Sequence, residues 1–334
     1  MKTKMLDYLC CAVCRSPLTT EDRANDVSHS EIQDGYLCCL KCESRYIIRN
    51  SIPRFVDEKN YADTFGFEWN KHARAQIDKF NGFSFSKERF YAVTGWSDDL
   101  RGQLILEAGS GAGRFTQVAC KTGAEVISFD YSSAVEANWK NNKEYENLHI
   151  FQGDIYHIPL RQGLFDKVFC FGVLQHTPNV KDAFMSLVPY VKPSGELVID
   201  IYNKRIRSML SWKYLLRPLT KRMDKEFLYN IIVRTNPILL PCANLLRKYL
   251  GKLGGKIMPI VSYAHLGLPA ELNREWSILD TFDMYSPAYD HPQSKKTVKS
   301  WFREAGFKNV RISNGPNGLN AKGLKPEDFS QDVP

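Results

Sequence analysis

The stretch that decides the fold is LILEAGSGAGRFT, residues 104–116. Its apolar run ends at Glu107 and is followed by Gly109, Gly111 and Gly113, after which the sequence becomes helix-like. Glycines at this point permit a tight turn and let a ligand approach the backbone at the carboxyl edge of a parallel sheet. The spacing Gly-x-Gly-x-Gly differs from the Gly-x-Gly-x-x-Gly of dinucleotide-binding folds. Taken alone, the triplet indicates an ordinary strand-to-helix turn more readily than a ligand site.

The next two expected strands end in carboxylates. Asp130 closes EVISFD, 17 residues after Gly113, and Asp154 follows LHIFQG. A carboxylate at the end of the second strand can accept hydrogen bonds from both hydroxyls of a ribose. Together with the glycines, these acids predict a nucleoside site, with Asp130 at the ribose and Asp154 near the base.

The rest of the chain divides into segments of different character. We expect a zinc-ribbon module at 1–57, a helical cap at 58–100, an α/β core at 101–202, a basic helical insertion or lid at 203–275, and at 276–334 a substrate loop followed by the helix and strand that complete the core. Apolar runs alternate with helical ones in the core, which predicts parallel βαβ units. The Gly/Asn-rich tail after Asn314 is expected to be loose. Without a transmembrane-length apolar run or a signal-peptide core, we expect a cytoplasmic protein.

Residues 101–202 resemble class I S-adenosylmethionine-dependent methyltransferases. The resemblance rests on EAGSGAGRF, FDYS, GDIYHIPL, FDKVFCFGVLQHTPNV and LVPYVKPSGELVI, which occur in that order. It implies a Rossmann-like α/β fold with a seven-stranded sheet, whose antiparallel last strand would be KNVRIS at 308–313. The cofactor contacts it implies are Glu107, Gly109, Gly111, Gly113, Asp130, Tyr131, Asp154 and Ile155, with Phe171 and Gln175 nearby. Family members often close an N-terminal helix over the cofactor, which adds Trp69 and Gln76; core packing is the alternative for Trp69.

The end of the fourth strand indicates the kind of acceptor. It reads GVLQHTPN, which resembles small-molecule O- and C-methyltransferases and lacks the Asn/Asp-Pro-Pro-Tyr-like tetrapeptide of many amino-directed members. We therefore expect O-methylation of a small-molecule, sugar or natural-product acceptor. A hydroxyl acceptor must lose its proton, usually to His, Asp/Glu or a metal. His176 is the first candidate base, and a structural histidine near the cofactor is the alternative.

A second candidate cluster occupies LDTFDMYSPAYDHPQS, residues 279–294. It contains Asp283, Tyr285 and His291, and its two prolines predict a non-helical loop that covers the active site. The alternative is a surface loop with an Asp-His-Pro turn. This loop, an FxxxW…QxD segment and a front ribbon together resemble a group of bacterial methyltransferases associated with glycan or secondary-metabolite modification.

Residues 203–256 carry 13 Lys/Arg against two acids, whereas the whole chain has a net charge of +8. The plain interpretation is a helical lid or dimer contact with a solvated basic side. Alternatives are a surface for anionic membranes or a lipid-linked substrate, and an RNA-binding face. Among these functional options, we favour an anionic small substrate, such as a nucleotide-sugar or lipid phosphate, over RNA.

Six of the nine cysteines lie in the first 57 residues. Cys11-x2-Cys14 and Cys39-x2-Cys42 have the spacing of a four-cysteine zinc ribbon. The continuation ESRYIIRNSIPRF resembles the Trm112-like zinc ribbons that accompany methyltransferases, with Ile and Ser in place of a proline and a glycine. Cys10 and Cys38 are expected to be bystanders. Four thiolates leave zinc no open position, so we expect a structural rather than a catalytic metal.

Three functions remain from the sequence. The first is an S-adenosylmethionine-dependent O-methyltransferase for a small or glycosylated acceptor. The second is an RNA methyltransferase that grips nucleic acid with the ribbon and the basic insertion. The third is a binding module that keeps the fold without turnover.

Overall fold

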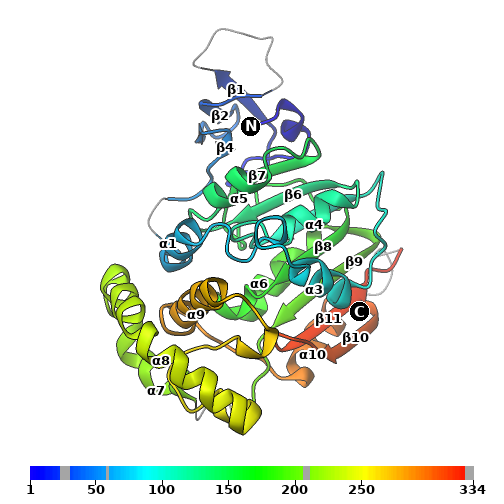
Figure 1. Cartoon of the computed structure of the whole chain (residues 1–334). Coiled ribbons are helices and arrows are strands. Elements are labelled where there is room, and N and C mark those ends of the chain that lie inside the picture. Colours follow the sequence, from blue (N-terminus) through cyan, green and yellow to red (C-terminus); the bar gives the residue numbers. More distant parts are fainter. Residues whose placement is uncertain (23–30, 58–59, 206–210, 328–334) are drawn as a thin grey trace.

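The computed structural model describes residues 1–22, 31–57, 60–205 and 211–327 (Figure 1). An N-terminal sheet of four antiparallel strands is ordered β1-β2-β3-β4. Its elements are η1 (Thr3–Asp7), β1 (Leu18–Asp22), β2 (Gly35–Cys39), β3 (Arg45–Arg49) and β4 (Ile52–Pro53). The strands of this sheet bring the two cysteine pairs of the ribbon together.

The second sheet has seven strands in the order β10-β11-β9-β8-β5-β6-β7. Its strands are β5 (Leu104–Ala108), β6 (Glu125–Asp130), β7 (Leu148–Gln152), β8 (Phe165–Phe171), β9 (Val191–Ile201), β10 (Lys308–Asn314) and β11 (Leu319–Leu324). The five strands from β9 to β7 are parallel to one another. The expected Rossmann-like α/β fold with seven strands is therefore confirmed.

The identity of the antiparallel strand differs from the prediction. KNVRIS forms β10, which lies at the edge of the sheet, and β11 is the strand inserted antiparallel between β10 and β9. The segment expected to be loose after Asn314 thus contains a core strand. LNAKGL shows weak alternation, but Leu319 and Ala321 are buried and the backbone pairs with strands on both sides. Pairing on both sides, rather than a strong apolar pattern, holds β11 in place.

Helices cover both faces of this sheet. Alternate residues of each strand face opposite layers, so that Ile105 packs with α3 and α4, whereas Leu106 belongs to the core that includes α6 and α10. These helices are α3 (Phe85–Thr94), α4 (Thr116–Lys121), α5 (Val135–Asn142), α6 (Val180–Leu187) and α10 (Lys295–Glu304). Short 3-10 helices η2 (Leu174–His176) and η3 (Val188–Tyr190) flank α6.

A further helical layer belongs to the insertion between β9 and α10 (Figure 1). It contains α7 (Trp212–Thr220), α8 (Lys225–Gly254), η5 (Ala264–Leu266) and α9 (Ala270–Tyr285). The N-terminal helices α1 (Asp63–Lys71) and α2 (Asp78–Asn81) precede α3, and α9 packs against both α8 and α1. The insertion and the cap therefore meet over the core.

The stretch LDTFDMYSPAYDHPQS is helical in its first half, which corrects the expectation of a loop. Helix α9 continues to Tyr285, and the expected boundary between 275 and 276 falls inside it. Pro287 disfavours helical backbone only at the residue before it and beyond, so the residues up to Tyr285 remained free to join a helix.

The ribbon packs directly on the β7 side of the core (Figure 1). Arg54 is buried and donates to Gln152 Oε1 at 2.7 Å, and its guanidinium also pairs with Glu136. Arg15 donates to the Ile158 carbonyl at 2.7 Å. Apolar side chains of the ribbon share one core cluster with the large sheet. Guanidiniums that saturate backbone and side-chain acceptors of the core fix the ribbon to it.

Candidate active site

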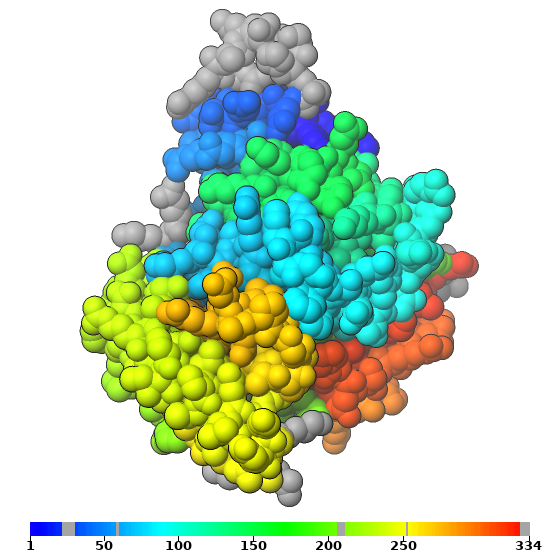
Figure 2. All heavy atoms as spheres, in the orientation of Figure 1, coloured from blue at the N-terminus to red at the C-terminus, as the bar shows by residue number. Residues whose placement is uncertain are grey.

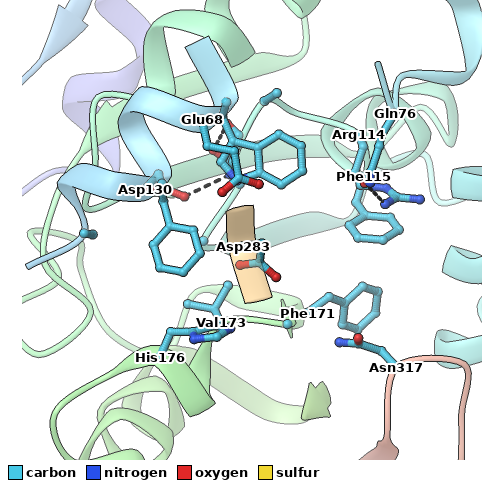
Figure 3. Close-up of a pocket in the computed structure, with 18 of the residues that line it drawn as sticks. Glu68, Gln76, Arg114, Phe115, Asp130, Phe171, Val173, His176, Asp283 and Asn317 are labelled. Carbon is cyan, nitrogen blue, oxygen red and sulfur yellow. Dashed lines mark hydrogen bonds between the residues drawn. The ribbon is translucent and has the colours of Figure 1, made fainter. Parts of the chain in front are cut away.

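A cavity of about 520 Å³ opens at the carboxyl ends of the parallel strands. Residues that follow β5, β6, β7, β8 and β9 form its floor, and residues of α1, α7 and α9 form its opposite wall. The close-up in Figure 3 shows Glu68, Asp283 and His176 on this wall and floor. The space-filling view in Figure 2 shows the cap, in cyan, directly against the yellow-to-orange part of the insertion.

The glycine loop forms one end of the cavity. Gly109 and Gly111 line it and have positive φ of 81° and 51°, where a side chain would be strained. The Gly111 N–H donates to Asp130 Oδ2 at 2.9 Å, and Ser132 donates to the other oxygen through its N–H and its hydroxyl. A Cβ on Gly111 would lie 3.3 Å from the Trp69 ring nitrogen. Trp69 therefore covers the loop from the side of α1.

Glu107 points away from the cavity into a buried polar network. Its Oε2 accepts hydrogen bonds from the hydroxyls of Thr116 and Ser128. Asn138 donates to both of these hydroxyls, at 3.0 and 3.3 Å. Burial raises the pKa of Glu107 to about 7, although the two hydroxyl donors oppose that shift. Glu107 thus connects the end of β5 to β6 and to the start of α4.

Three carboxyl groups, those of Glu68, Asp280 and Asp283, line the cavity from the side of α1 and α9. Glu68 is buried and neither of its carboxyl oxygens has a hydrogen-bond partner, whereas Asp280 accepts from Gln76 at 3.1 Å and from the Tyr263 hydroxyl. Burial, together with the charges of Asp283 and Asp280, raises the pKa of Glu68 well above its ordinary range. Burial and the nearby Asp283 raise the pKa of Asp280 to about 7. Near neutral pH, burial therefore favours the protonated form of Glu68 and leaves Asp280 divided between its two forms.

His176 lies near Asp283, one of these three carboxyl groups. Its Nδ1 is 3.0 Å from the Tyr289 carbonyl oxygen, and a carbonyl can only accept, so Nδ1 carries the proton and Nε2 keeps a free lone pair. Phe65 and Tyr202 pack on the ring, with centroids 5.1 and 5.3 Å away. Burial lowers the pKa of His176, and the charge of Asp283 partly offsets this effect. A neutral imidazole with a fixed tautomer can accept a proton from a bound ligand.

Two guanidiniums flank the ring of Phe115 on a further wall. Arg114 and Arg89 lie 5.0 and 5.3 Å from its centroid. Arg89 pairs with the buried Asp200 at 2.8 Å, whereas Arg114 contacts the neutral Gln76. Burial and the neighbouring Arg89 lower the pKa of Arg114 to about 10. Arg114 remains cationic at neutral pH and can receive an anionic group of a ligand.

Comparisons with known proteins agree with this geometry. Residues 106–199 match the family model described as a methyltransferase domain. The core of this chain is a class I S-adenosylmethionine-dependent methyltransferase domain. A ubiquinone biosynthesis O-methyltransferase of Coxiella burnetii is 28% identical over 113 residues, which is 33% of this chain and 48% of the relative. The corresponding enzyme of Acinetobacter baumannii is 26% identical over 140 residues, 38% of this chain and 58% of the relative. The chain thus spans about half the length of the curated relatives it matches.

Two solved structures resemble the methyltransferase domain and its surroundings. A putative S-adenosylmethionine-dependent methyltransferase from Methanococcus maripaludis has 15% identity and a TM-score of 0.45, covering 83% of this chain and 98% of that one. A complex of the Haloferax volcanii Trm112 methyltransferase activator with a putative methyltransferase has 12% identity and a TM-score of 0.46, covering 80% and 100%.

The residues of the methyltransferase domain fit S-adenosylmethionine. Asp130 at the end of β6 borders the cavity and can receive ribose hydroxyls, while Arg114 can receive the carboxylate of the methionine moiety. Glycine turns with positive φ give the backbone close access to a ligand. When bound, this cofactor supplies an electrophilic methyl group.

The cavity brings together most of the residues predicted for the cofactor and the chemistry. Those that line it are Trp69, Gln76, Gly109, Gly111, Asp130, Tyr131, Ile155, Phe171, His176 and Asp283. The predicted residues that do not line it are Glu107, Gly113, Asp154, Gln175, Tyr285 and His291.

Three of the residues outside the cavity lie in other surroundings. Asp154 accepts from the Tyr156 N–H and pairs with His157, and the Tyr285 hydroxyl donates to the Pro259 carbonyl at 3.0 Å. His291 is exposed and borders a separate cavity of about 410 Å³. The predicted roles of these side chains at the active site therefore have no geometric support.

Several lining residues escaped the sequence reasoning. Glu68 directly precedes Trp69 in FGFEWNK, and Arg114 directly follows Gly113, so both were adjacent to predicted residues. Arg89 and Asn317 come from segments without a motif, and both contact Asp200. For Glu68 and Arg114, the sequence offered one indication, namely a charged residue directly next to a predicted site residue.

The metal-ligand prediction has a matching cluster in the ribbon. The Sγ atoms of Cys11, Cys14, Cys39 and Cys42 all lie within 4.8 Å of one another. The pairs Cys11–Cys42 and Cys14–Cys39 are 3.5 and 3.4 Å apart. Tetrahedral zinc with Zn–S bonds of about 2.3 Å separates its sulfurs by about 3.8 Å, so the cluster fits such an ion. Among the described residues of the ribbon, none lines the cavity, which agrees with a structural metal.

Proposed function

We propose that the protein transfers a methyl group from S-adenosylmethionine to a hydroxyl oxygen of a small or glycosylated acceptor, with His176 as general base. The observation that carries the proposal is the hydrogen bond from His176 Nδ1 to the Tyr289 carbonyl, which leaves Nε2 unprotonated on the cavity wall. The O-methyltransferase names of the curated relatives support an oxygen acceptor.

In this proposal the chain positions the acceptor and removes its proton. His176 Nε2 would take the hydroxyl proton as the oxygen attacks, and the carboxylate of Asp283 would favour the resulting imidazolium. Proton transfer of this kind contributes about 10²–10⁴-fold to a rate. The cap and the insertion would exclude water from the cavity and hold the reactants in line.

The carboxylate near His176 also constrains the acceptor. Asp283 disfavours a phosphate or carboxylate at the reacting end, because like charges would be brought together with little solvent. An anionic group of the acceptor would have to lie elsewhere. The charge of Asp283 thus favours a neutral hydroxyl compound, such as a phenol or a sugar, over the anionic small substrate expected from the basic insertion.

The test is a tritiated methyl-transfer screen against phenols, catechols and sugars, followed by kinetics on the best acceptor. We expect His176→Gln to lower kcat about 10²–10⁴-fold while its affinity for S-adenosylhomocysteine stays within about twofold of wild type. Asn317→Ala is a matched control, since Asn317 lines the same cavity without a titratable group. Unchanged turnover in His176→Gln would assign a structural role to this histidine. Methylation of amines but not of hydroxyls would contradict the choice of acceptor.

A further inference from the structure

The insertion carries an unusual concentration of exposed apolar side chains. Of the 14 large apolar side chains exposed among the described residues, 11 lie between residues 212 and 257. The other three, Val13, Leu40 and Phe80, are scattered over the ribbon and the cap. An apolar surface gathered on one element of a protein marks an interaction site.

On α8 these side chains form a stripe. At 100° per residue, Phe227, Ile231, Ile238, Leu245 and Tyr249 fall within about 40° of one another around the helix axis. The buried residues Leu228, Tyr229, Ile232, Leu240 and Ala243 lie on a separate sector, and α8 packs against α9. Helix α8 therefore has two apolar faces, one packed in the protein and one exposed to solvent.

Helix α7 repeats this arrangement at shorter length. Trp212, Leu215 and Leu219 are exposed at positions i, i+3 and i+7, which share one side of a helix. The Trp212 ring nitrogen donates to the Ile257 carbonyl at 2.7 Å, so the start of α7 touches the segment that follows α8. Figure 1 shows α7 and α8 together at the lower left of the molecule, and Figure 2 shows the same region, in yellow-green, at the surface.

Basic residues accompany the apolar ones. Residues 211–257 contain ten Lys/Arg and only two acids, Asp224 and Glu226. Two of the ten, Lys213 and Arg217, pair with Asp290 inside the protein and do not belong to the exposed face. Arg234 and Lys248 are exposed, and by helix periodicity they flank the apolar stripe of α8. Apolar side chains bordered by Lys and Arg are the composition of helices that lie in the interface of an anionic membrane.

We propose that the exposed face of α7 and α8 binds the surface of an anionic lipid bilayer, with the helices parallel to the membrane plane. The apolar stripe would enter the boundary between head groups and acyl chains, and the basic residues would contact lipid phosphates. A second copy of the chain fits less well, because two surfaces of the same positive charge would face each other. Nucleic acid would use the basic residues but leave the aliphatic stripe exposed. Within the described residues, none of the helices has the length and apolar character of a membrane span.

The surface is joined to the wall of the cavity. Lys213 lines the cavity and pairs with Asp290 at 3.0 Å, whereas its neighbour Trp212 belongs to the exposed apolar side of α7. A bilayer bound at this face would thus lie next to an element of the active site. The proposal is independent of the reaction, since it concerns residues that do not line the cavity.

The test compares co-sedimentation with vesicles of phosphatidylcholine alone and with added phosphatidylglycerol. We expect the wild-type protein to bind the anionic vesicles only, and salt to weaken this binding. The double variant Ile238→Asp/Leu245→Asp should bind these vesicles at least about tenfold more weakly. The control Val13→Asp/Leu40→Asp makes the same chemical change at equally exposed positions of the ribbon and should bind like wild type. S-adenosylhomocysteine binding, unchanged in both variants, shows that they are folded.

Four results would overturn the proposal. One is the absence of binding to anionic vesicles, and another is an equal loss of binding in the control variant. The third is a wild-type dimer in sedimentation velocity that Ile238→Asp/Leu245→Asp converts to a monomer without vesicles, because a second copy would then cover the face. Binding of an RNA oligonucleotide without vesicle binding would likewise assign the basic residues to nucleic acid and contradict the membrane proposal.

Discussion

Replacing Glu107 with Gln should make the protein more stable at alkaline pH without affecting the cofactor. Burial raises the pKa of this carboxyl from 4.5 to about 7. A raised folded-state pKa means that the stabilising contribution is complete below the unfolded pKa and is lost as pH rises through the folded one. At 1.36 kcal/mol per pKa unit, the wild-type protein loses about 3 kcal/mol of its free energy of unfolding at pH 8 through this group, and under about 1 kcal/mol at pH 5.

Glutamine is neutral and nearly isosteric, so it keeps an acceptor for Thr116 and Ser128 and escapes this loss. Urea unfolding followed by circular dichroism measures the free energy of unfolding of both proteins. The difference between Glu107→Gln and wild type should shift in favour of the variant by about 2 kcal/mol from pH 5 to pH 8. The affinity for S-adenosylhomocysteine should stay unchanged, because Glu107 does not line the cavity.

Glu125→Gln is the matched control, with a shift of opposite sign. Burial alone would raise the pKa of Glu125, but hydrogen bonds from Lys4 and His149 outweigh burial and lower it. The stabilising contribution of Glu125 is thus present above its unfolded pKa and lost as pH falls, so this variant should be less stable than wild type at neutral pH. Parallel pH profiles for wild type and Glu107→Gln, or a weakened affinity for S-adenosylhomocysteine, would refute the buried position of Glu107.

Two further substitutions test the packing of the glycine loop and the metal site of the ribbon. Gly113→Ala should lower the free energy of unfolding by about 2–4 kcal/mol. The φ of Gly113 is 86°, and the added Cβ would overlap with Asn138 and break its buried hydrogen bonds. An unchanged urea midpoint would contradict this packing. The ribbon should hold one zinc ion per chain by mass spectrometry of metals, lost in Cys14→Ser and kept in Cys38→Ser, whose thiol lies outside the four-sulfur cluster. Metal loss should lower the thermal midpoint and leave the affinity for S-adenosylhomocysteine intact, whereas loss of cofactor binding would contradict a purely structural metal.

The fold and half of the site could be predicted because their signals are contiguous. The glycine loop and the acid that ends β6 are short patterns whose geometry follows from the backbone, and both meet at the cavity as predicted. The cysteine spacing similarly predicts the sulfur cluster. The alternation of strands and helices predicts the parallel α/β core, and the resemblance to class I methyltransferases implies the seven strands that the structure has.

The remaining features depend on tertiary contacts that the sequence does not display. Glu107 and Asp130 both stand at the end of a strand, but the direction of each side chain is set by its neighbours, and Thr116 and Ser128 turn Glu107 away from the cavity. Glu68 lines the cavity only because α1 packs against α9. Strand β11 has little apolar alternation and is held by pairing on both sides. Such features are decided by partners distant in sequence.

The most direct test of the central claim is calorimetric titration of the full chain with S-adenosylhomocysteine. We predict one site per chain, with affinity at least about tenfold lower in Asp130→Ala, a loss of about 1.4 kcal/mol, and unchanged in Asp154→Ala. The two acids end neighbouring strands, but only Asp130 lines the cavity. Absence of binding by wild type, or an equal loss in the two variants, would contradict the assignment of this cavity to the cofactor.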